Sequence, residues 1–254
     1  MPVLKTENLC KDFMGLRAID RLDFTVEEGK IHGLIGPNGS GKTTFFNLVS
    51  GIFPATEGKI YFESVDITKL PAHVITKMGI SRTFQIARIM DRTNCLDNVM
   101  AGLHCRTRTD IFGTIFRLPF THSTQEKNMK NRAIELLEFV GLENAAQRSA
   151  AQLVWVETQL LQIARALATE PKLLLLDEPT AGMGSSESQQ VQKIIKQINE
   201  MDITVVVVSH DIRLVIGVSD AITVIEFGKK IAEGTPDQIQ NNPHVLEAYL
   251  GKEE

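Results

Sequence analysis

Short apolar runs alternate with amphipathic segments along most of the chain and predict a mixture of strands and helices. Three apolar runs, at residues 31–35, 172–176 and 203–208, predict buried strands. The second run consists largely of four consecutive leucines bounded by charge and proline, which is typical of a parallel strand buried on both faces. Shorter patterns predict further strands at 3–9, 22–26, 58–67, 79–85, 222–227 and 229–234. The last two are expected to form a hairpin across Gly228.

Helical periodicity dominates the middle of the chain. Helices are predicted there at 98–103, 124–140 and 158–167, and Gly141 follows the second of them as a stop signal. Elsewhere, helices are predicted at 43–48, 71–78, 185–201 and 236–250. The pattern indicates one domain, an α/β core of residues 1–85 and 168–254 with a helical subdomain of about 86–167. The apolar stretch Ile111–Phe120 either folds back onto its own helices or forms a contact patch for another protein.

Composition is that of an ordinary globular protein, with 254 residues, 43% hydrophobic, 23% charged and a net charge of −4. The slightly acidic balance argues against a nucleic-acid-binding protein. No signal peptide is expected from the N-terminus, and no apolar run approaches the roughly 18–20 residues that span a bilayer. Any membrane role is therefore expected to depend on a partner.

Three cysteines, Cys10, Cys95 and Cys105, form no C-x-x-C pattern, and free thiols in a reducing cytoplasm are the simplest interpretation. A metal site at Cys95, His104 and Cys105 is disfavoured because a fourth ligand is missing.

The most specific chemical pattern is G-x-x-x-x-G-K-[ST] at Gly36–Thr43, between a buried strand and an amphipathic helix. Glycines in such a loop let the backbone turn sharply and present its N–H groups to phosphate oxygens. The helix that follows adds the positive end of its dipole. Lys42 can reach the β- and γ-phosphates, and the Thr43 hydroxyl can ligate Mg²⁺. A glycine-rich turn without a ligand is disfavoured by the complete motif and its flanks.

Acidic residues follow the leucine-rich strand, where ligands bind in open α/β sheets. Asp177 can hold Mg²⁺ through its water shell, and Glu178 can polarise a water for attack on the γ-phosphate. The alternative is a buried strand that ends in a solvated turn. The complete phosphate loop upstream makes that alternative improbable.

Three further residues are weaker candidates. Phe13 lies in a loop-like segment between strands, where it stacks on adenine or belongs to a half-buried core. Gln85 places its amide near Mg²⁺ or the attacking water, or is an exposed loop amide. His210 ends an apolar strand; a lone histidine is usually structural, but this position favours a γ-phosphate sensor.

Taken together, the phosphate loop, Gln85, the helical insert, LLLLDEPT and SHD resemble the ATP-binding subunits of ABC transporters. The resemblance covers essentially the whole chain. The chain is particularly similar to the ATP-binding subunits of branched-chain amino acid importers. The stretches that carry this similarity are FFNLVSGIFPATEG, GISRTFQ, IARAL and IAEGTP. The resemblance implies a P-loop NTPase fold of ABC type, with a mixed core sheet, an N-terminal antiparallel β portion and an inserted helical subdomain.

The resemblance also implies roles for single residues. Glu178 becomes the catalytic base, His210 the switch histidine, Gln85 the Mg²⁺- and water-sensing coupling residue, and Asp177 a metal partner with Thr43. Residues 181–184 occupy the loop that crosses the dimer interface. The implied nucleotide contacts come from Phe13, Gly36, Pro37, Asn38, Gly39, Ser40, Gly41, Lys42, Thr43 and Thr44. ATP and Mg²⁺ are the expected ligands.

One stretch departs from the family. The family carries a signature of the form L-S-x-G-Q, which grips the γ-phosphate bound to the opposite subunit. Here the aligned residues, Leu153–Glu157, have the sequence LVWVE, and we call them the signature stretch. Val154 replaces the signature serine and lacks its hydroxyl. Val156 replaces the glycine and is β-branched where the backbone must come close to the phosphate. Glu157 replaces the glutamine and places a carboxylate near the negatively charged triphosphate. We therefore expect an asymmetric heterodimer with a second ATPase, although a homodimer with a tolerated signature is the alternative.

The expected function is ATP-driven uptake of a small solute, namely branched-chain or other hydrophobic amino acids, or urea or amides. The expected partners are a second ATPase subunit, integral membrane permease subunits and, indirectly, a solute-binding protein, at the cytoplasmic face of the membrane. The alternatives are a lipid or polysaccharide exporter and a non-transport ATP-switched module for translation or DNA repair. Modules of the last kind usually carry tandem domains, basic extensions or coiled-coil insertions, and this chain shows none.

Overall fold

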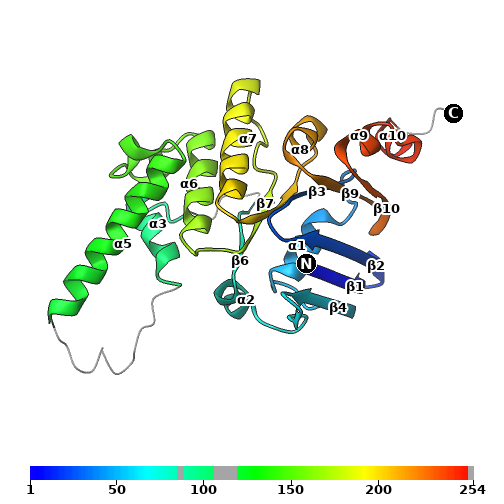
Figure 1. The fold of residues 1–254 in the computed structure, drawn as a ribbon, viewed down its shortest axis with the longest axis horizontal. Helices are drawn as coiled ribbons and strands as arrows, with labels where there is room; N and C mark the ends of the chain where they lie inside the picture. The colour runs from blue at the N-terminus through cyan, green and yellow to red at the C-terminus, as the bar shows by residue number, and fades with distance from the viewer. Residues whose placement is uncertain (85–88, 106–118, 251–254) are drawn as a thin grey trace. The chain divides into compact units, whose positions relative to one another are not determined.

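The computed structural model describes residues 1–84, 89–105 and 119–250. The chain divides into two compact units, one made of Met1–Gln85 with Lys172–Glu254 and the other of Ile86–Pro171. The first unit contains two sheets and the second is helical (Figure 1). The α/β class, with a mixed core sheet and an antiparallel N-terminal sheet, is thereby confirmed.

The antiparallel sheet has the strand order β2-β1-β4-β5. Its strands are β1 (Pro2–Phe13), β2 (Leu16–Glu27), β4 (Glu57–Phe62) and β5 (Val65–Asp66). The predicted loop around Phe13 is wrong, because β1 continues to Phe13, which pairs with Leu16. The turn is confined to Met14 and Gly15, both with positive φ. Phe13 therefore ends a strand, which fixes its backbone more firmly than a loop would.

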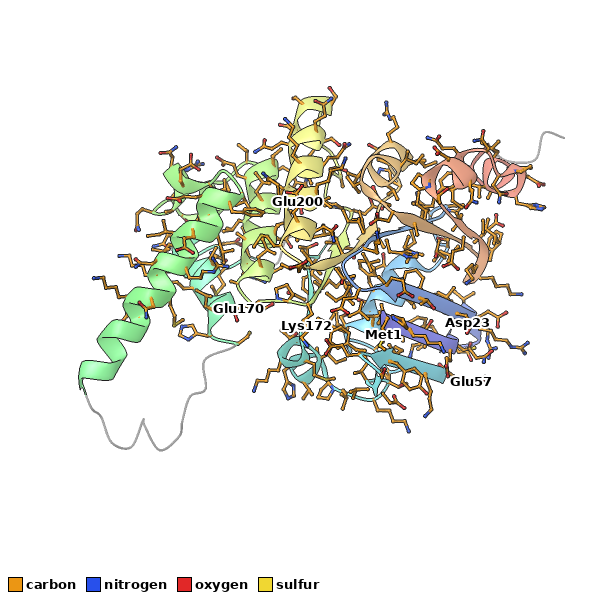
Figure 2. The ribbon with its side chains drawn as sticks, viewed as in Figure 1. Met1, Asp23, Glu57, Glu170, Lys172 and Glu200 are labelled. Carbon is orange, nitrogen blue, oxygen red and sulfur yellow. The ribbon has the colours of Figure 1, made fainter. Side chains whose placement is uncertain are left out.

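The second sheet has the order β10-β9-β3-β8-β7-β6 and is parallel except for the β9–β10 pair. Its strands are β3 (Ile31–Ile35), β6 (Ile80–Arg82), β7 (Leu173–Asp177), β8 (Thr204–Val208), β9 (Ala221–Glu226) and β10 (Lys229–Gly234). Every residue of β3, β7 and β8 is buried, as their apolar sequences predict. Lys172 precedes the amino end of β7 (Figure 2), so Asp177 lies at the opposite, carboxyl end.

Six helices belong to this unit within the described residues: α1 (Lys42–Val49), α2 (Ala72–Met78), α7 (Ser185–Glu200), α8 (Ile212–Val218), α9 (Pro236–Gln240) and α10 (Pro243–Leu250). Sequence patterns gave no indication of α8. The single helix predicted over 236–250 is wrong, because α9 ends before Asn241. Pro243 lacks an N–H and begins α10, and the Asn242 side chain accepts a bond from the His244 N–H.

Helix α1 packs between the two sheets. Phe45 and Phe46 are fully buried in a cluster with Phe24 of the antiparallel sheet and Leu34 of the parallel sheet. Ile35, on the opposite face of β3, packs with residues of α8, α9 and α10. Burial on both faces of β3 holds the loop between β3 and α1 at a fixed place, which matters for the site below.

The helical unit contains α3 (Cys95–Leu103), α5 (Pro119–Phe139) and α6 (Trp155–Leu167), with short 3₁₀ turns at Glu143–Ala145 and Ala150–Gln152. Helices α3 and α6 begin three residues before their predicted starts. For α3 the reason is a cap, because the Asn94 side chain accepts from the Asp97 N–H. Gly141 ends the second helix with positive φ, as predicted. Residues 111–118 of the apolar stretch, and Gln85, lie outside the described residues.

In the parts of the chain described here, no helix combines the length and apolar character needed to cross a bilayer. Cys10 and Cys95 are buried and Cys105 is exposed, and all three thiols are free. No cluster of three metal-ligating side chains occurs among the described residues.

His32 in the centre of β3 is the buried histidine of this core. Its Nε2 lies 2.8 Å from the Thr223 hydroxyl, and its ring packs against Phe24 at 4.7 Å between centroids. Burial lowers the pKa of His32 to about 4. The folded protein therefore holds His32 neutral, whereas the unfolded chain protonates it near pH 6.5.

We expect acid to destabilise the fold through His32. As pH falls from about 6.5 towards 4, only the unfolded state takes up this proton, so stability is lost across that window. Between pH 7 and pH 5 the wild-type chain should lose about 2 kcal/mol more than His32→Gln, which cannot titrate. Urea unfolding at both pH values measures the difference. Equal losses in the two proteins would contradict the assignment.

Candidate functional site

The loop between β3 and α1 has a shape that requires glycine at two positions. A Cβ on Gly36 would lie 2.0 Å from the carbonyl oxygen of Ile225. Gly41 has φ +106°, and a Cβ there would lie 2.7 Å from the carbonyl oxygen of Ala18. Gly39 has φ +79° with open space around it. The two ends of the loop thus pack closely against β9 and β2, while Gly39 in its middle faces open space.

Lys42, the first residue of α1, turns back into this loop. Its Nζ donates to the carbonyl oxygens of Gly36 at 2.6 Å and Pro37 at 2.9 Å. Burial lowers the pKa of Lys42, while the charges of Glu178 and Asp177 act in the opposite direction. An ammonium group is therefore held at the centre of the loop, with two carboxylates near enough to influence it.

A cavity of about 520 Å³ opens in front of the loop. Among the predicted site residues, its lining includes Phe13, Glu178 and Asn38, Gly39, Ser40, Gly41, Lys42, Thr43 and Thr44. Gly36 and Pro37 form the base of the loop and do not line the cavity. Leu16, Arg17, Ala18 and Phe227 complete the lining, and the sequence did not single them out.

Phe13 lies at this cavity with 38% of its surface exposed. Its ring meets the ring of Phe53 edge-on, at 5.5 Å between centroids and an interplanar angle of 79°. The Lys11 ammonium lies 4.9 Å from the Phe13 ring and donates to the carbonyl oxygen of Pro54 at 2.9 Å. The Lys11 ammonium therefore covers one face of the Phe13 ring, and part of the ring surface stays accessible.

Asp177 ends β7 as half of a buried ion pair. Its Oδ2 lies 2.7 Å from Arg82 Nη2, and the exposed fractions of the two side chains are 1% and 5%. Arg82 also donates to Asn47 Oδ1 at 2.7 Å and lies over the Phe46 ring. Asp177 Oδ1 is buried without a hydrogen-bond partner among the described residues. One carboxylate oxygen is thus fixed by Arg82 and the other is buried without a partner, and Asp177 does not line the cavity.

Glu178, the next residue, is held by the end of the neighbouring strand β8. Its Oε2 lies 2.7 Å from His210 Nδ1 and accepts from the Ser209 hydroxyl at 3.3 Å and the His210 N–H at 3.2 Å. Its backbone N–H donates to the carbonyl oxygen of Val208, and its φ is +50°. The parallel pairing of β7 and β8 therefore brings together two residues that the sequence predicts separately.

In the helical unit, the signature stretch begins α6. Val154 and Trp155 are exposed, by 63% and 44%. Glu157 Oε2 accepts from the Val154 N–H at 3.1 Å, and its two oxygens receive Arg148 Nη1 and Nη2 at 2.8 and 3.1 Å. Arg148 lowers the pKa of Glu157. The carboxylate is therefore turned towards its own helix and an arginine, which differs from the exposed anion expected from the sequence.

Comparison with known proteins identifies the family. The sequence model described as ABC transporter matches residues 19–181, and that described as branched-chain amino acid ATP-binding cassette transporter matches residues 229–254. The chain is 37% identical over 252 residues to the high-affinity branched-chain amino acid transport ATP-binding protein BraF of Pseudomonas aeruginosa, covering 99% of this chain and 98% of BraF. This chain belongs to the ABC transporter family.

Other relatives show how widely this ABC ATPase fold is used. The lipopolysaccharide export system ATP-binding protein LptB of Escherichia coli is 34% identical and is covered over 99% of its length by the whole of this chain. The ATP-binding cassette MJ1267, solved in the ADP conformation, superposes with a TM-score of 0.86 at 31% identity, covering 99% of this chain and 100% of that one. The cassette MJ0796, solved as a post-hydrolysis dimer with ADP and Pi, gives 0.79 at 28% identity, covering 92% and 98%. The chain is an ATP-binding subunit of this transporter family and an ATPase.

Three residues at or beside the cavity were not singled out from the sequence. Arg82 lies in the GISRTFQ stretch, but its partner Asp177 is 95 positions away. Ser209 directly precedes the predicted His210, so the sequence carried a local signal. Phe227 follows β9 beside the hairpin glycine and is 80% exposed, and its position in the sequence gave no signal of a role. Gln85 lies outside the described residues, so its predicted role stays a prediction.

We expect the Arg82–Asp177 pair to be strongly coupled in this ABC ATPase. Removing either charge leaves the other buried and unpaired, so Arg82→Met and Asp177→Asn should each destabilise the chain by about 3–5 kcal/mol. The double variant should be much less destabilised than the sum of the two, because no lone charge remains. Urea unfolding of all four proteins completes the cycle. Additive losses would show that the pair is uncoupled.

Proposed function

We propose that this chain is the ATP-binding subunit of an importer for branched-chain or other hydrophobic amino acids, with urea or amides as the alternative solutes. The observation that supports ATP hydrolysis is that the phosphate loop and Glu178, which is held by His210, line the same cavity. Full-length similarity to BraF, and the branched-chain match at residues 229–254, support the solute class.

In this proposal the loop binds the triphosphate of ATP. The backbone N–H groups of Asn38–Thr44 and the amino end of α1 supply donors, and Lys42 exchanges its two loop carbonyls for phosphate oxygens. Phe13 stacks on adenine with the face left accessible by Phe53. Pro37 and Gly36 support the loop from below. The predicted nucleotide contacts at Ser40 and Thr44 belong to the same lining.

The residues at the end of β7 fit a Mg²⁺ ion. Asp177 Oδ1 is buried without a partner in the described structure, and the Thr43 hydroxyl lines the cavity. Carboxylate and hydroxyl oxygens are the ligands that Mg²⁺ prefers. We propose that Thr43 and Asp177, with Gln85, hold the ion, which would neutralise charge on the β- and γ-phosphates. Arg82 keeps the other oxygen of Asp177 in place.

Glu178 is proposed as the general base. The donors described around it all contact Oε2, so Oε1 is the oxygen that takes the proton of the attacking water. The water oxygen forms a bond to the γ-phosphorus as the bond to the β–γ bridging oxygen breaks, which releases ADP and phosphate. His210 orients Glu178 and senses the γ-phosphate from the same position.

The proposed partners are a second ATPase subunit and integral membrane permeases at the cytoplasmic face of the membrane, with a solute-binding protein acting indirectly. The exporter alternative rests on the similarity to LptB. A pulldown that recovers permeases of an amino acid importer, rather than lipid-export components or ribosomes, would support the proposal.

We further propose that the second ATPase is a different protein. A phosphate at the N-terminus of α6 would need the donors there, but Glu157 already accepts from Val154 N–H and is paired with Arg148. In this proposal Arg148 neutralises the carboxylate, and the obstacle is the Val154 N–H that Glu157 already occupies rather than repulsion. The machinery at Lys42, Asp177 and Glu178 is complete, so this chain would act against a partner's intact signature.

We expect restoration of the signature stretch to create a self-sufficient ATPase. The purified wild-type chain should bind ATP but hydrolyse it slowly. The variant Val154→Ser, Val156→Gly, Glu157→Gln should hydrolyse ATP at least about tenfold faster, because its α6 N-terminus can then contact phosphate in a homodimer. Steady-state phosphate release measures both. Brisk hydrolysis by the wild-type chain, unchanged by restoration, would contradict asymmetry.

Glu178→Gln tests the proposed base. The substitution is made in the wild-type chain or in the variant with the restored signature stretch, whichever hydrolyses ATP faster. It should lower the hydrolysis rate by at least about 100-fold, because the amide cannot accept the proton, while ATP binding persists. The control is Glu200→Gln, an exposed glutamate at the end of α7, which should leave the rate unchanged. A Glu178→Gln enzyme with ordinary turnover would assign the base to another group.

A further inference from the structure

An aromatic residue occupies the tip of the β9–β10 hairpin in a conformation that aromatic residues rarely adopt. Phe227 is 80% exposed and has φ +47°, and Gly228 beside it has φ +77°. Two successive positive φ angles are typical of a tight hairpin turn, which normally takes Asn-Gly or Asp-Gly. A bulky side chain in this region strains the backbone, and Phe227 gains little packing in return.

The turn is fixed against the phosphate loop by main-chain bonds. The Gly228 N–H donates to the carbonyl oxygen of Ser40 at 2.9 Å, and the Gly228 carbonyl accepts from the Asp20 N–H at 2.9 Å. Lys229 Nζ lies 3.2 Å from Asp20 Oδ2. A Cβ on Gly228 would lie 2.6 Å from the carbonyl oxygen of Ala18, so the approach is close. Phe227 is therefore positioned by rigid neighbours, although its own ring is exposed.

That position is at the nucleotide cavity. Phe227 lines the same 520 Å³ space as Phe13, Lys42 and Glu178. The Phe13 ring contacts the Phe53 ring. Phe227 lies on a separate element, the β9–β10 turn. An exposed aromatic surface that borders a binding cavity becomes buried only when the cavity is filled.

We propose that Phe227 is a second aromatic contact for the nucleoside part of the bound nucleotide. It covers the base or its ribose from the β9–β10 turn, while Phe13 stacks from the end of β1. This inference deepens the proposed function, because it rests on the phosphate loop binding a nucleoside triphosphate. The predicted consequence is tighter binding of nucleoside triphosphates than of triphosphate alone, with a preference for the larger purine surface.

The test compares three probes, ATP, CTP and inorganic tripolyphosphate, by isothermal titration calorimetry of the full chain with Mg²⁺. Phe227→Ala should weaken ATP binding roughly 3- to 10-fold and reduce the preference for ATP over CTP, since aromatic stacking is lost. Tripolyphosphate binding should not change. Phe227→Tyr, which keeps the aromatic face, should restore most of the affinity.

Met14→Ala is the matched control. Met14 is also fully exposed at a hairpin turn with positive φ, next to Phe13, but does not line the cavity. Its substitution should leave the affinity for all three probes unchanged. An effect of Met14→Ala equal to that of Phe227→Ala would overturn the proposal, because loss of any exposed apolar surface would then explain the result.

Other outcomes separate this inference from the proposed function. If Phe227→Ala binds ATP normally while Phe13→Ala binds it weakly, the second contact is wrong and the proposed site stands. If Phe227→Ala weakens tripolyphosphate as much as ATP, the residue acts by shaping the loop, and the proposal is also wrong. If Lys42→Ala leaves binding of ATP and tripolyphosphate intact, the proposed phosphate site itself fails.

Discussion

The interaction on which the site depends most is the buried ion pair between Arg82 and Asp177. It ties three elements together, because Arg82 belongs to β6, Asp177 ends β7, and Asn47 of α1 accepts from the same guanidinium. Both side chains are almost inaccessible, so neither charge can be left alone without a large loss of stability. The pair therefore fixes the end of β7, and with it Glu178, relative to the helix that begins at Lys42.

The predictions that the structure confirms concern elements whose signals are local in sequence. The phosphate loop is flanked by a strand and a helix that the sequence predicts. The leucine run predicts β7, and the two carboxylates follow it directly. The contact between Glu178 and His210 follows from parallel pairing, which places the carboxyl ends of β7 and β8 side by side. Arg82 could not be found this way, because nothing near it in sequence reveals a partner 95 positions away. The break between α9 and α10 did have a local signal, the Asn-Asn-Pro run before α10, which outweighed the apolar pattern.

Glu157 shows how the structure changes the reason behind an expectation. Residue types alone suggested that a carboxylate would repel the γ-phosphate of an opposing subunit. The structure shows that carboxylate neutralised by two guanidinium nitrogens of Arg148 and accepting the Val154 N–H. The Val154 N–H is therefore already used, so the proposal of an asymmetric pair rests on hydrogen bonding rather than on charge.

Two residues that line the cavity have strained backbones. Glu178 and Phe227 are both non-glycine residues with positive φ, at +50° and +47°, and both line that cavity. Such conformations persist when the surroundings over-determine them. For Glu178 the determinants are the Val208 carbonyl and His210; for Phe227 they are the bonds of Gly228 to Ser40 and Asp20. One strained residue thus lies at the phosphate end of the cavity and one at the proposed nucleoside end, and neighbouring strands hold both in place. This arrangement is expected when the position of a side chain matters more than local stability.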